Sequence, residues 1–257
     1  MKKMKAGIIG GTHGMGRWMA VLLRAQGFAV SVAGRETKTT AVDLAGRCDV
    51  VVVAVPIAAT ADVIREVGPR VKRGRLLMDL TSLKTEPVAL MLAHSAADVV
   101  GCHPLFGPSV SDPAGHPIVL CRGRGDDGYA LMKTVFKKAG YRVLETTPEA
   151  HDKMMSVVQA LNHFNTIVLG MAVAEAGIPF PELQPFSTPI FKTKMEIVRK
   201  VFTDTPGLYA DILAGNPHTK KTLESYEGVV QRIRARLDAG DAAGLMQSME
   251  DAAKKLF

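Results

Sequence analysis

Three stretches of the chain hold polar side chains that can move protons or bind anions: DLTSLKTEPV (79–88), GCHPLFGPSV (101–110) and HDKMMSVVQALNHF (151–164). His103 is the strongest candidate for chemistry, because the pKa of an imidazole lies near neutral pH and suits it to general acid–base work. It directly follows Val99–Cys102, a predicted strand, and ligands bind at the carboxyl ends of strands in open α/β sheets. We therefore predict that His103 is catalytic, with a purely structural histidine as the alternative.

Ser82 and Lys84 follow another predicted strand, Leu76–Leu80, and so lie at a second carboxyl edge. The structural alternative for Ser82 is a helix N-cap. However, Thr85 stands three residues later, where a capping box would have Glu or Gln. Lys84 either brings positive charge to a substrate or cofactor, or is a solvated lysine at a helix start.

The third stretch predicts a helix on which His151, Met155, Gln159 and His163 recur every four residues. Each step of four drifts by roughly 40°, so Gln159 and His163 lie nearly one above the other. An amide and an imidazole on a mostly apolar face are unusual for core packing, so we predict that both line a substrate pocket. His151 and Asp152 are nearer the domain junction, where they cap or brace the helix.

AGIIGGTHGMGRWMA (6–20) joins an apolar run, four glycines and a predicted helix. Such a turn lets the backbone approach a pyrophosphate, and the helix N-terminus offers free N–H groups. In the register Gly11-x-His13-x-x-Gly16 a histidine replaces the second glycine of G-x-G-x-x-G, whereas Gly10-x-x-x-Gly14-x-Gly16 is an alternative spacing. Glycines that serve only tight packing are the competing interpretation.

The end of the second predicted strand indicates which dinucleotide binds. NAD-binding folds place Asp or Glu there for the ribose 2′-hydroxyl, but VSVAGRETKT has Gly34 and Arg35. A guanidinium binds a phosphate bidentately, so we predict NADP, with NAD less favoured and a solvated basic loop as the alternative. The residues predicted to hold the cofactor are Gly10, Gly11, Thr12, His13, Gly14, Met15, Gly16, Gly34, Arg35, Thr37, Lys38, Val55 and Pro56.

Short apolar runs alternate with helical segments in the first half of the chain, which predicts an α/β fold with a doubly wound parallel sheet. The helix between the second and third strands is expected to be only a turn or two. The predicted strands are Ala6–Ile9, Ala29–Ala33, Val50–Val55, Leu76–Leu80, Val99–Cys102, Ile118–Cys121 and Arg142–Leu144, and the predicted helices are Met15–Gln26, Ala58–Val67 and Glu86–His94.

After about Thr147 the pattern becomes helical. Pro148 near the start and Gly177 just past the end frame one long helix, apolar on most faces, that should be central to the second half. Further helices are predicted near 191–202, 208–214, 219–239 and 242–255. We predict an N-terminal Rossmann-like NADP-binding domain (1–147) and a C-terminal all-helical substrate and dimerisation domain (148–257), since so apolar a helical domain often completes its core in a homodimer.

The composition of the 257 residues limits the partners. The formal charge is +7, but the basic residues are dispersed and there are few aromatics, which favours small anionic ligands over nucleic acid. No stretch is expected to serve as a membrane span. Cys48, Cys102 and Cys121 have no metal-ligand spacing, so we predict no metal site and a reducing cytoplasmic location.

The three polar stretches, the glycine turn and LYADI (208–212) together resemble the prephenate dehydrogenase family of tyrosine biosynthesis, over essentially the whole chain. The H-P-x-F-G-P element and the H-D-x-x-M-x-x-x-Q-x-L-x-H-F helix are the specific parts of the resemblance. The sequence looks most like the stand-alone short form, without a fused mutase or regulatory domain.

The resemblance implies an oxidoreductase that performs oxidative decarboxylation: the C4 hydride of prephenate passes to the nicotinamide, CO2 leaves, and 4-hydroxyphenylpyruvate forms. His103 matches the family's catalytic histidine, which polarises or removes the C4 hydroxyl proton. Ser82 occupies the family's serine position, where its hydroxyl is expected to orient His103 and the substrate hydroxyl.

One position departs from the family. The family anchors a substrate carboxylate with an arginine nine residues before the tyrosine of LYADI, and counting back from Tyr209 reaches Lys200, beside Arg199. Lysine cannot form the bidentate fork of an arginine, so either Lys200 substitutes or Arg199 serves. Lys192 and Lys194 are further cationic candidates. The departure leaves open whether the substrate is prephenate or its amino analogue arogenate.

Two other functions compete with this interpretation. An NADP-dependent hydroxyacid dehydrogenase or imine reductase shares the domain plan, but the hydroxyacid enzymes carry a Lys and Asn four residues apart, and Lys153 is followed by Val157. A non-catalytic NADP-sensing module would not need Ser82, His103, Gln159 and His163 to converge on one cleft.

Overall fold

The N-terminal half of the chain is a single seven-stranded sheet. The computed structural model describes residues 3–110 and 112–257, and within them the strand order is β2-β1-β3-β4-β5-β6-β7. The strands correspond to the seven predicted runs: β1 (Lys5–Ile9), β2 (Ala29–Ala33), β3 (Val50–Val53), β4 (Leu76–Asp79), β5 (Asp98–Pro104), β6 (Pro117–Arg124) and β7 (Arg142–Thr146).

The expectation of a parallel sheet is wrong at one place. All neighbouring strands pair in parallel except β5 and β6, which are antiparallel. A parallel return would need a crossover element, usually a helix. No helix lies between β5 and β6 among the residues described there, so the chain folds back on itself, and β5 extends to Pro104 alongside its new partner.

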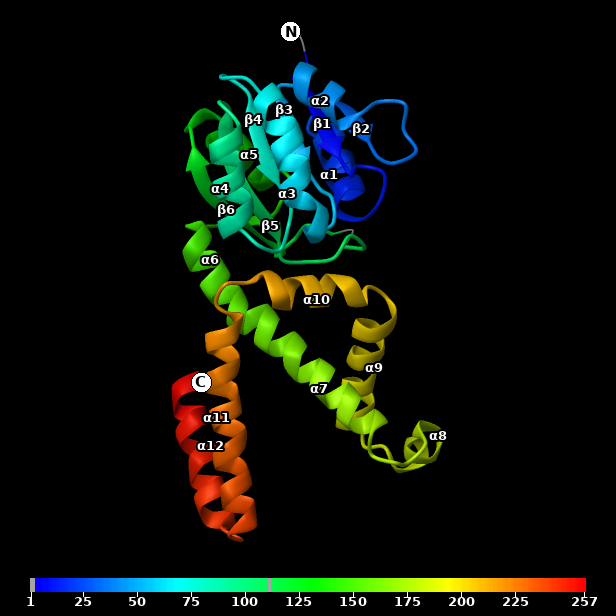
Figure 1. The fold of residues 1–257 in the computed structure, drawn as a ribbon, viewed down its shortest axis with the longest axis vertical. Helices are drawn as coiled ribbons and strands as arrows, with labels where there is room; N and C mark the ends of the chain where they lie inside the picture. The colour runs from blue at the N-terminus through cyan, green and yellow to red at the C-terminus, as the bar shows by residue number, and fades with distance from the viewer. Residues whose placement is uncertain (1–2, 111) are drawn as a thin grey trace.

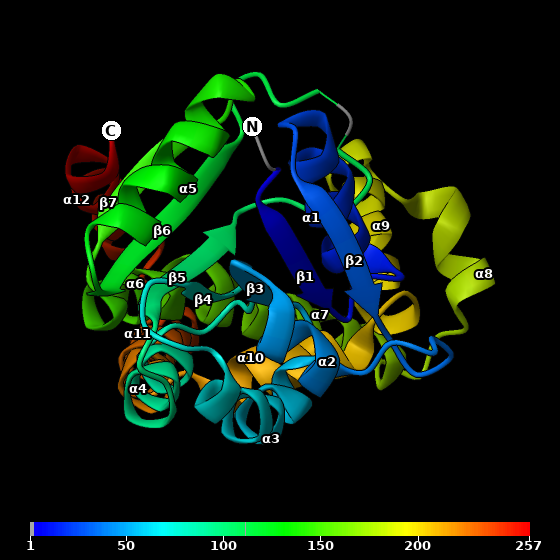
Figure 2. The ribbon, with the colours of Figure 1, turned by 90° about the horizontal axis from the view of Figure 1, so that it is seen from above.

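Helices cover both faces of the sheet, as Figure 2 shows. Each face has its own cluster of buried apolar side chains. On one face lie α1 (Gly14–Ala25) and α5 (Asp127–Lys138), which bury Met19, Leu23 and Phe136. On the other lie α2 (Ala41–Arg47), α3 (Ile57–Val67) and α4 (Thr85–His94), with the short η1 (Gly68–Arg70). The short α2 confirms the expected turn or two, whereas α5 was not predicted.

The C-terminal half is entirely helical in the described residues. A continuous helical run comprises α6 (Pro148–Met155), the π-helical η2 (Ser156–Leu161) and α7 (Asn162–Ala174). It is followed by α8 (Phe180–Leu183), η3 (Gln184–Phe186), α9 (Pro189–Thr203), α10 (Pro206–Gly215), α11 (Thr219–Asp238) and α12 (Ala242–Leu256). Figure 1 shows α10 running beneath the sheet domain while the α11–α12 hairpin projects away from it.

The wide turn in the long helix changes which side chains share a face. In a regular α-helix, positions eight residues apart differ by about 80° around the axis, but one extra residue taken up by a π turn reduces this to about 20°. Gln159 lies within η2, eight positions after His151 on α6, and both side chains contact the same partner, as described below.

Much of the helical half is apolar at its surface. The run Pro148–Ala174 is long and apolar enough to cross a membrane by length and composition, and only 17% of its most apolar window is buried, so the expectation that no stretch reaches this threshold is wrong. Core helices of other proteins have the same length and composition, so these two properties do not by themselves place the run in a membrane. Val158 and Met171 are exposed on this run, and exposed apolar side chains continue on the neighbouring helices, among them Ile190, Val230, Leu237 and Met249.

Candidate active site

A cavity of about 710 Å³ lies at the carboxyl end of β1, where the chain turns into α1. Gly10 has a φ of +83°, and a Cβ there would lie 2.4 Å from the Ala54 carbonyl oxygen. A Cβ on Gly16 would lie 2.2 Å from the carbonyl oxygen of Gly10. Because only glycine fits at both positions, the backbone forms a close cradle at the start of α1, which has no acidic residue in its first turn. These residues fit the pyrophosphate of a dinucleotide.

Most of the predicted cofactor residues line this cavity: Gly10, Thr12, His13, Gly14, Met15, Gly34, Arg35, Val55 and Pro56. Four others do not. Gly11 packs tightly against Ile8 and Val32, Gly16 lies under the turn, and Lys38 is exposed outside the lining.

The fourth, Thr37, acts on the backbone of the loop after β2. Its hydroxyl accepts a hydrogen bond from the Gly34 N–H at 2.9 Å, so it shapes the loop rather than facing the cavity. Glu36 also lines the cavity beside Arg35, a position not predicted from the sequence, because it lies three residues past the end of β2.

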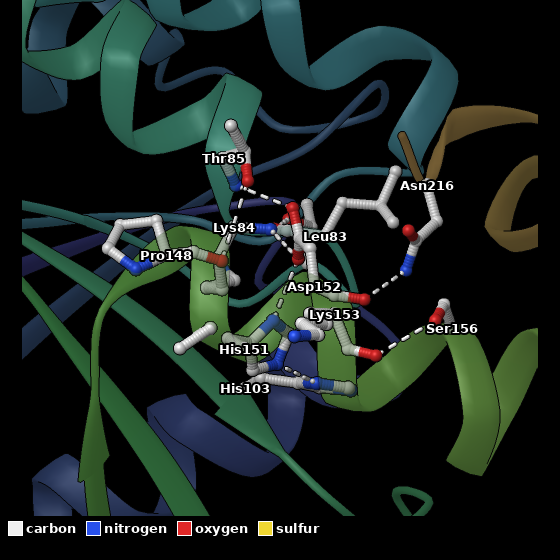
Figure 3. Close-up of polar contacts among 12 residues, drawn as sticks. Leu83, Lys84, Thr85, His103, Pro148, His151, Asp152, Lys153, Ser156 and Asn216 are labelled. Atoms are coloured by element: carbon white, nitrogen blue, oxygen red, sulfur yellow. Dashed lines mark hydrogen bonds and ion pairs between the residues drawn. The ribbon is translucent and has the colours of Figure 1, made fainter. Parts of the chain in front are cut away.

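His103 lies within β5, opposite Val119, and its side chain is 3% exposed. Its Nδ1 is 2.9 Å from Nε2 of His151, and its Nε2 is 3.5 Å from Nε2 of Gln159. The structure therefore brings the predicted His103 and Gln159 together, and adds His151. Figure 3 shows the two imidazoles meeting below the start of α4.

Asp152 joins the two domains. Its Oδ1 accepts a hydrogen bond from the Lys84 N–H at 2.9 Å and its Oδ2 one from the Thr85 N–H at 2.8 Å, so it caps α4 from the other domain. Its Oδ1 also lies 2.8 Å from Nδ1 of His151. The prediction that His151 and Asp152 only cap or brace their own helix is wrong, because a carboxylate, His151 and His103 form one buried line (Figure 3).

Burial controls the protonation of this line. Burial, with His151 and Lys84 nearby, lowers the pKa of His103 well below 6.5, against the opposing effect of Asp152. His103 is thus neutral near pH 7 and able to accept a proton. Burial alone would raise the pKa of Asp152, but hydrogen bonds from His151, Thr85 and Lys84 lower it, so this carboxylate is ionised.

Lys84 does not face a substrate or a cofactor. Its side chain is completely buried, and the ammonium pairs with Asp79 and donates a 3.0 Å hydrogen bond to the Cys102 carbonyl oxygen. Its charge is therefore used to hold β4 against β5, one residue before His103, which corrects the prediction of a binding role.

Ser82 lies after β4 and is partly buried. No hydrogen bond joins it to His103 in the part of the chain that the structure describes, so the expected contact is absent, and the imidazole that meets His103 is that of His151.

The loop after His103 is anchored by aromatic packing. The ring of Phe106 is stacked on Tyr141 at 5.4 Å and meets Trp18 of α1 edge-on at 5.2 Å, and the Trp18 indole N–H donates to the Tyr141 hydroxyl. The family-like H-P-x-F-G-P element is thereby fixed to the helix that starts at the dinucleotide cradle.

His163 lies one further step along the long helix, with its ring 4.7 Å from that of Tyr209 on α10. Burial lowers its pKa, so it too is neutral. Of the predicted cations, Arg199 and Lys192 line a different cavity, of about 1070 Å³, between α7 and α9. Lys194 and Lys200 are exposed on α9. No ion pair or hydrogen bond involves any of these four side chains within residues 112–257.

The nucleotide-binding sheet, the buried histidine beside it and the helical second domain define a dinucleotide-dependent oxidoreductase. Residues 29–145 match the family model of the prephenate dehydrogenase nucleotide-binding domain, and residues 147–251 match that of the prephenate dehydrogenase dimerization domain. The chain belongs to the prephenate dehydrogenase family.

Individual relatives agree with this assignment. The chain is 34% identical over 266 residues to a probable arogenate/prephenate dehydrogenase of Methanocaldococcus jannaschii, covering 96% of this chain and 60% of the relative. It is 30% identical to the T-protein of Haemophilus influenzae, covering 94% and 64%. The chain thus spans less than two thirds of the length of these relatives.

Solved structures share the fold. A crystal structure of prephenate dehydrogenase from Aquifex aeolicus, in complex with hydroxyphenyl propionate and NAD+, superposes with a TM-score of 0.81 at 19% identity, covering 99% of this chain and 98% of that one. Arogenate dehydrogenase from Synechocystis superposes with a TM-score of 0.73 at 17% identity, covering 99% and 100%.

Proposed function

We propose that this protein oxidatively decarboxylates prephenate to 4-hydroxyphenylpyruvate with NADP as the hydride acceptor. The observation that carries the proposal is His103: it is neutral, buried and connected to Asp152 through His151, and its Nε2 has only the long contact with Gln159 among the described residues. A base of this kind is required to take the substrate's hydroxyl proton. The family assignment supplies the reaction class.

The residues that would hold the dinucleotide are the cradle around Gly10 and Gly16, with Arg35 at the adenosine end, and the bound nicotinamide would supply the hydride acceptor. His103 Nε2 accepts the C4 hydroxyl proton as the C4–H electron pair departs. When the ring carboxylate leaves as CO2, its electron pair returns through the ring to the C4 oxygen, which recovers the proton from Nε2. The proton count balances without an external acid, so one imidazole serves as base and then acid.

Gln159 and His163 form the proposed wall of the substrate pocket. The Gln159 Oε1 is buried without a hydrogen-bond partner in the described part of the chain. An unpaired buried acceptor costs about 1–3 kcal/mol, and a substrate hydroxyl can satisfy it. We assign the carboxylate-anchoring role to Lys200 rather than Arg199, because Arg199 lines the separate cavity between α7 and α9. Ser82 is kept as a candidate catalytic group that contacts the substrate directly.

The experiment that tests the function is a direct assay. Purified protein is mixed with NADP and either prephenate or arogenate, and the reduced cofactor is followed by its absorbance. Turnover of prephenate supports the proposal. Turnover of arogenate alone supports the second candidate, arogenate dehydrogenase, which the name of the Methanocaldococcus relative gives beside prephenate dehydrogenase. No turnover with either substrate would refute both and favour an NADP-sensing protein.

Arg35→Ala tests the cofactor preference. The guanidinium is exposed at the rim of the dinucleotide cavity. A charge-assisted hydrogen bond contributes about 1.5–3 kcal/mol, so the Kd for NADP should rise by about 10- to 150-fold. The Kd for NAD should change by less than about threefold, because NAD lacks the 2′-phosphate. Both dissociation constants are measured by titration calorimetry.

Glu36→Gln is the matched control, since it removes the neighbouring charge without removing the guanidinium. It should not raise the Kd for NADP. Equal losses for both cofactors in Arg35→Ala would contradict the assignment.

We further propose a homodimer through the helical domain (148–257), with residues 1–147 as the nucleotide-binding domain. The exposed apolar side chains of α7, α9, α11 and α12 support this, as does the match to a dimerization domain. The long helix carries Gln159, Asn162, His163 and Asn165 in its apolar stretch, and polar groups of this kind are costly in a bilayer. A second protomer therefore suits these exposed apolar faces better than a bilayer does. A monomeric mass measured by light scattering at micromolar concentration would refute the proposed homodimer.

We propose a cytoplasmic location without nucleic-acid partners. Cys48, Cys102 and Cys121 are buried free thiols, which a reducing compartment preserves. Secretion of the native protein, shown by cell fractionation, would refute this.

A further inference from the structure

The hydrogen bonds from Asp152 through His151 to His103 have a defined direction. They involve Nδ1 of His103, whereas the proposed proton acceptor is the other ring nitrogen, Nε2. All three side chains are nearly completely buried, with 1% of His151, 1% of Asp152 and 3% of His103 exposed. The two contacts are 2.8 and 2.9 Å. Such distances are those of ordinary hydrogen bonds, so each contact needs one donor and one acceptor.

Asp152 decides which atom donates. Its two oxygens already accept hydrogen bonds from the backbone N–H groups of Lys84 and Thr85, and an ionised carboxylate can only accept. The Nδ1 of His151 must therefore carry a proton and donate a hydrogen bond to Asp152. A neutral His151 then has a lone pair on Nε2, so this atom accepts a hydrogen bond from Nδ1 of His103.

We infer that His151 and Asp152 are positioning residues that hold His103 in the tautomer with its proton on Nδ1 and a free lone pair on Nε2. This inference deepens the proposed function and rests on it. The opposite tautomer would present an N–H to the substrate hydroxyl and could not take its proton. The orientation of the base is thus set from α6 of the other domain.

The same line stabilises the charge that forms during the reaction. When His103 accepts the proton it becomes an imidazolium, whose Nδ1–H points at the lone pair of His151, with the Asp152 carboxylate behind it. The nearest other cation, Lys84, is paired with Asp79, so the carboxylate of Asp152 is free to act on the two imidazoles. An oriented acceptor in a buried site is worth more than the same group in water.

Two variants of His151 separate this role from simple packing. His151→Leu keeps much of the side-chain volume but removes the acceptor. His151→Gln keeps an amide oxygen that can accept from His103 Nδ1. We expect His151→Leu to lower kcat for prephenate by about 100-fold with KM changed less than about threefold, and His151→Gln to stay within about tenfold of the unaltered protein.

The second readout does not depend on turnover. Long-range ¹H–¹⁵N spectra of the full-length protein report the tautomer of each imidazole, and the His103 signals are assigned by their loss in His103→Asn. We expect the Nδ1–H tautomer for His103 in the unaltered protein and in His151→Gln, and a shift toward Nε2–H in His151→Leu. The NADP Kd and melting temperature of both variants, measured alongside, identify a variant that has merely lost its fold.

The outcomes are distinguishable. An Nε2–H tautomer of His103 in the unaltered protein overturns the inference, and so does a folded His151→Leu that keeps the Nδ1–H tautomer. Equal kcat values for the two His151 variants overturn the claim that the acceptor matters for turnover. If the unaltered protein turns over neither prephenate nor arogenate, the proposed function fails, while the spectra still decide whether His151 sets the tautomer.

Discussion

His103→Asn is expected to lower kcat for prephenate by about 10³-fold, the middle of the range for general acid–base catalysis. The asparagine amide can still donate a hydrogen bond toward His151, but it cannot take the proton of the substrate hydroxyl. The dinucleotide cradle is built from other elements, so the Kd for NADP should stay within about twofold of its original value. Steady-state kinetics and titration calorimetry measure the two quantities.

His163→Asn is the matched control, because it also replaces a neutral imidazole, a half-buried one, on the substrate side. It should act mainly on KM, since His163 packs against Tyr209 and does not belong to the proton line. In the unaltered protein, the lowered pKa of His103 places the acid limb of kcat/KM below pH 6.5. An unchanged kcat in His103→Asn would remove this residue from the mechanism.

Lys84→Met should destabilise the protein by about 3–5 kcal/mol, because removal of one partner of a buried ion pair leaves the other charge uncompensated. Asp79 is 0% exposed, and its other donors in the described residues are the N–H and hydroxyl of Thr81, which carry no charge to replace that of the ammonium. The midpoint of chemical denaturation, followed by circular dichroism, reports the loss.

The double variant Asp79→Asn/Lys84→Met is the control for this prediction. It removes both charges, and uncharged groups of similar volume often replace a buried pair at little cost. We expect the double variant to regain more than half of the stability that Lys84→Met loses. A loss below about 1 kcal/mol in Lys84→Met would mean that the pair behaves like an exposed one.

The sheet could be predicted from the sequence because its strands are short, apolar and separated by glycine-rich turns. Val50–Val53 is buried on both sides, which is the pattern of a central parallel strand. The glycines at 10 and 16 indicated the cradle, because no other residue type fits where two backbones meet. Helix α5 was missed although Tyr129, Met132, Val135 and Phe136 repeat at helical spacing, so that omission was avoidable.

Other features depend on contacts between distant residues, which no local pattern reveals. The antiparallel β6 depends on how the chain returns after Pro104, and Lys84 is buried only because Asp79 and the Cys102 carbonyl meet it. His151 was assigned to its own helix because its partner is 48 residues away. The π turn at Ser156–Leu161 is a second reason. A spacing of four residues places side chains on one face only in a regular α-helix, so it could not show that His151 and Gln159 meet the same partner.

The bonds made by Asp152 also restrict how the two domains can move. Its carboxylate accepts hydrogen bonds from Lys84 and Thr85 at the start of α4 in the other domain, while its carbonyl oxygen is held by Asn216 of its own helical domain. A rotation of one domain against the other that preserves the hydrogen bonds from Lys84 and Thr85 to Asp152 must have its axis close to Asp152. Points on such an axis are displaced least, so the two imidazoles on either side of the domain junction keep their spacing.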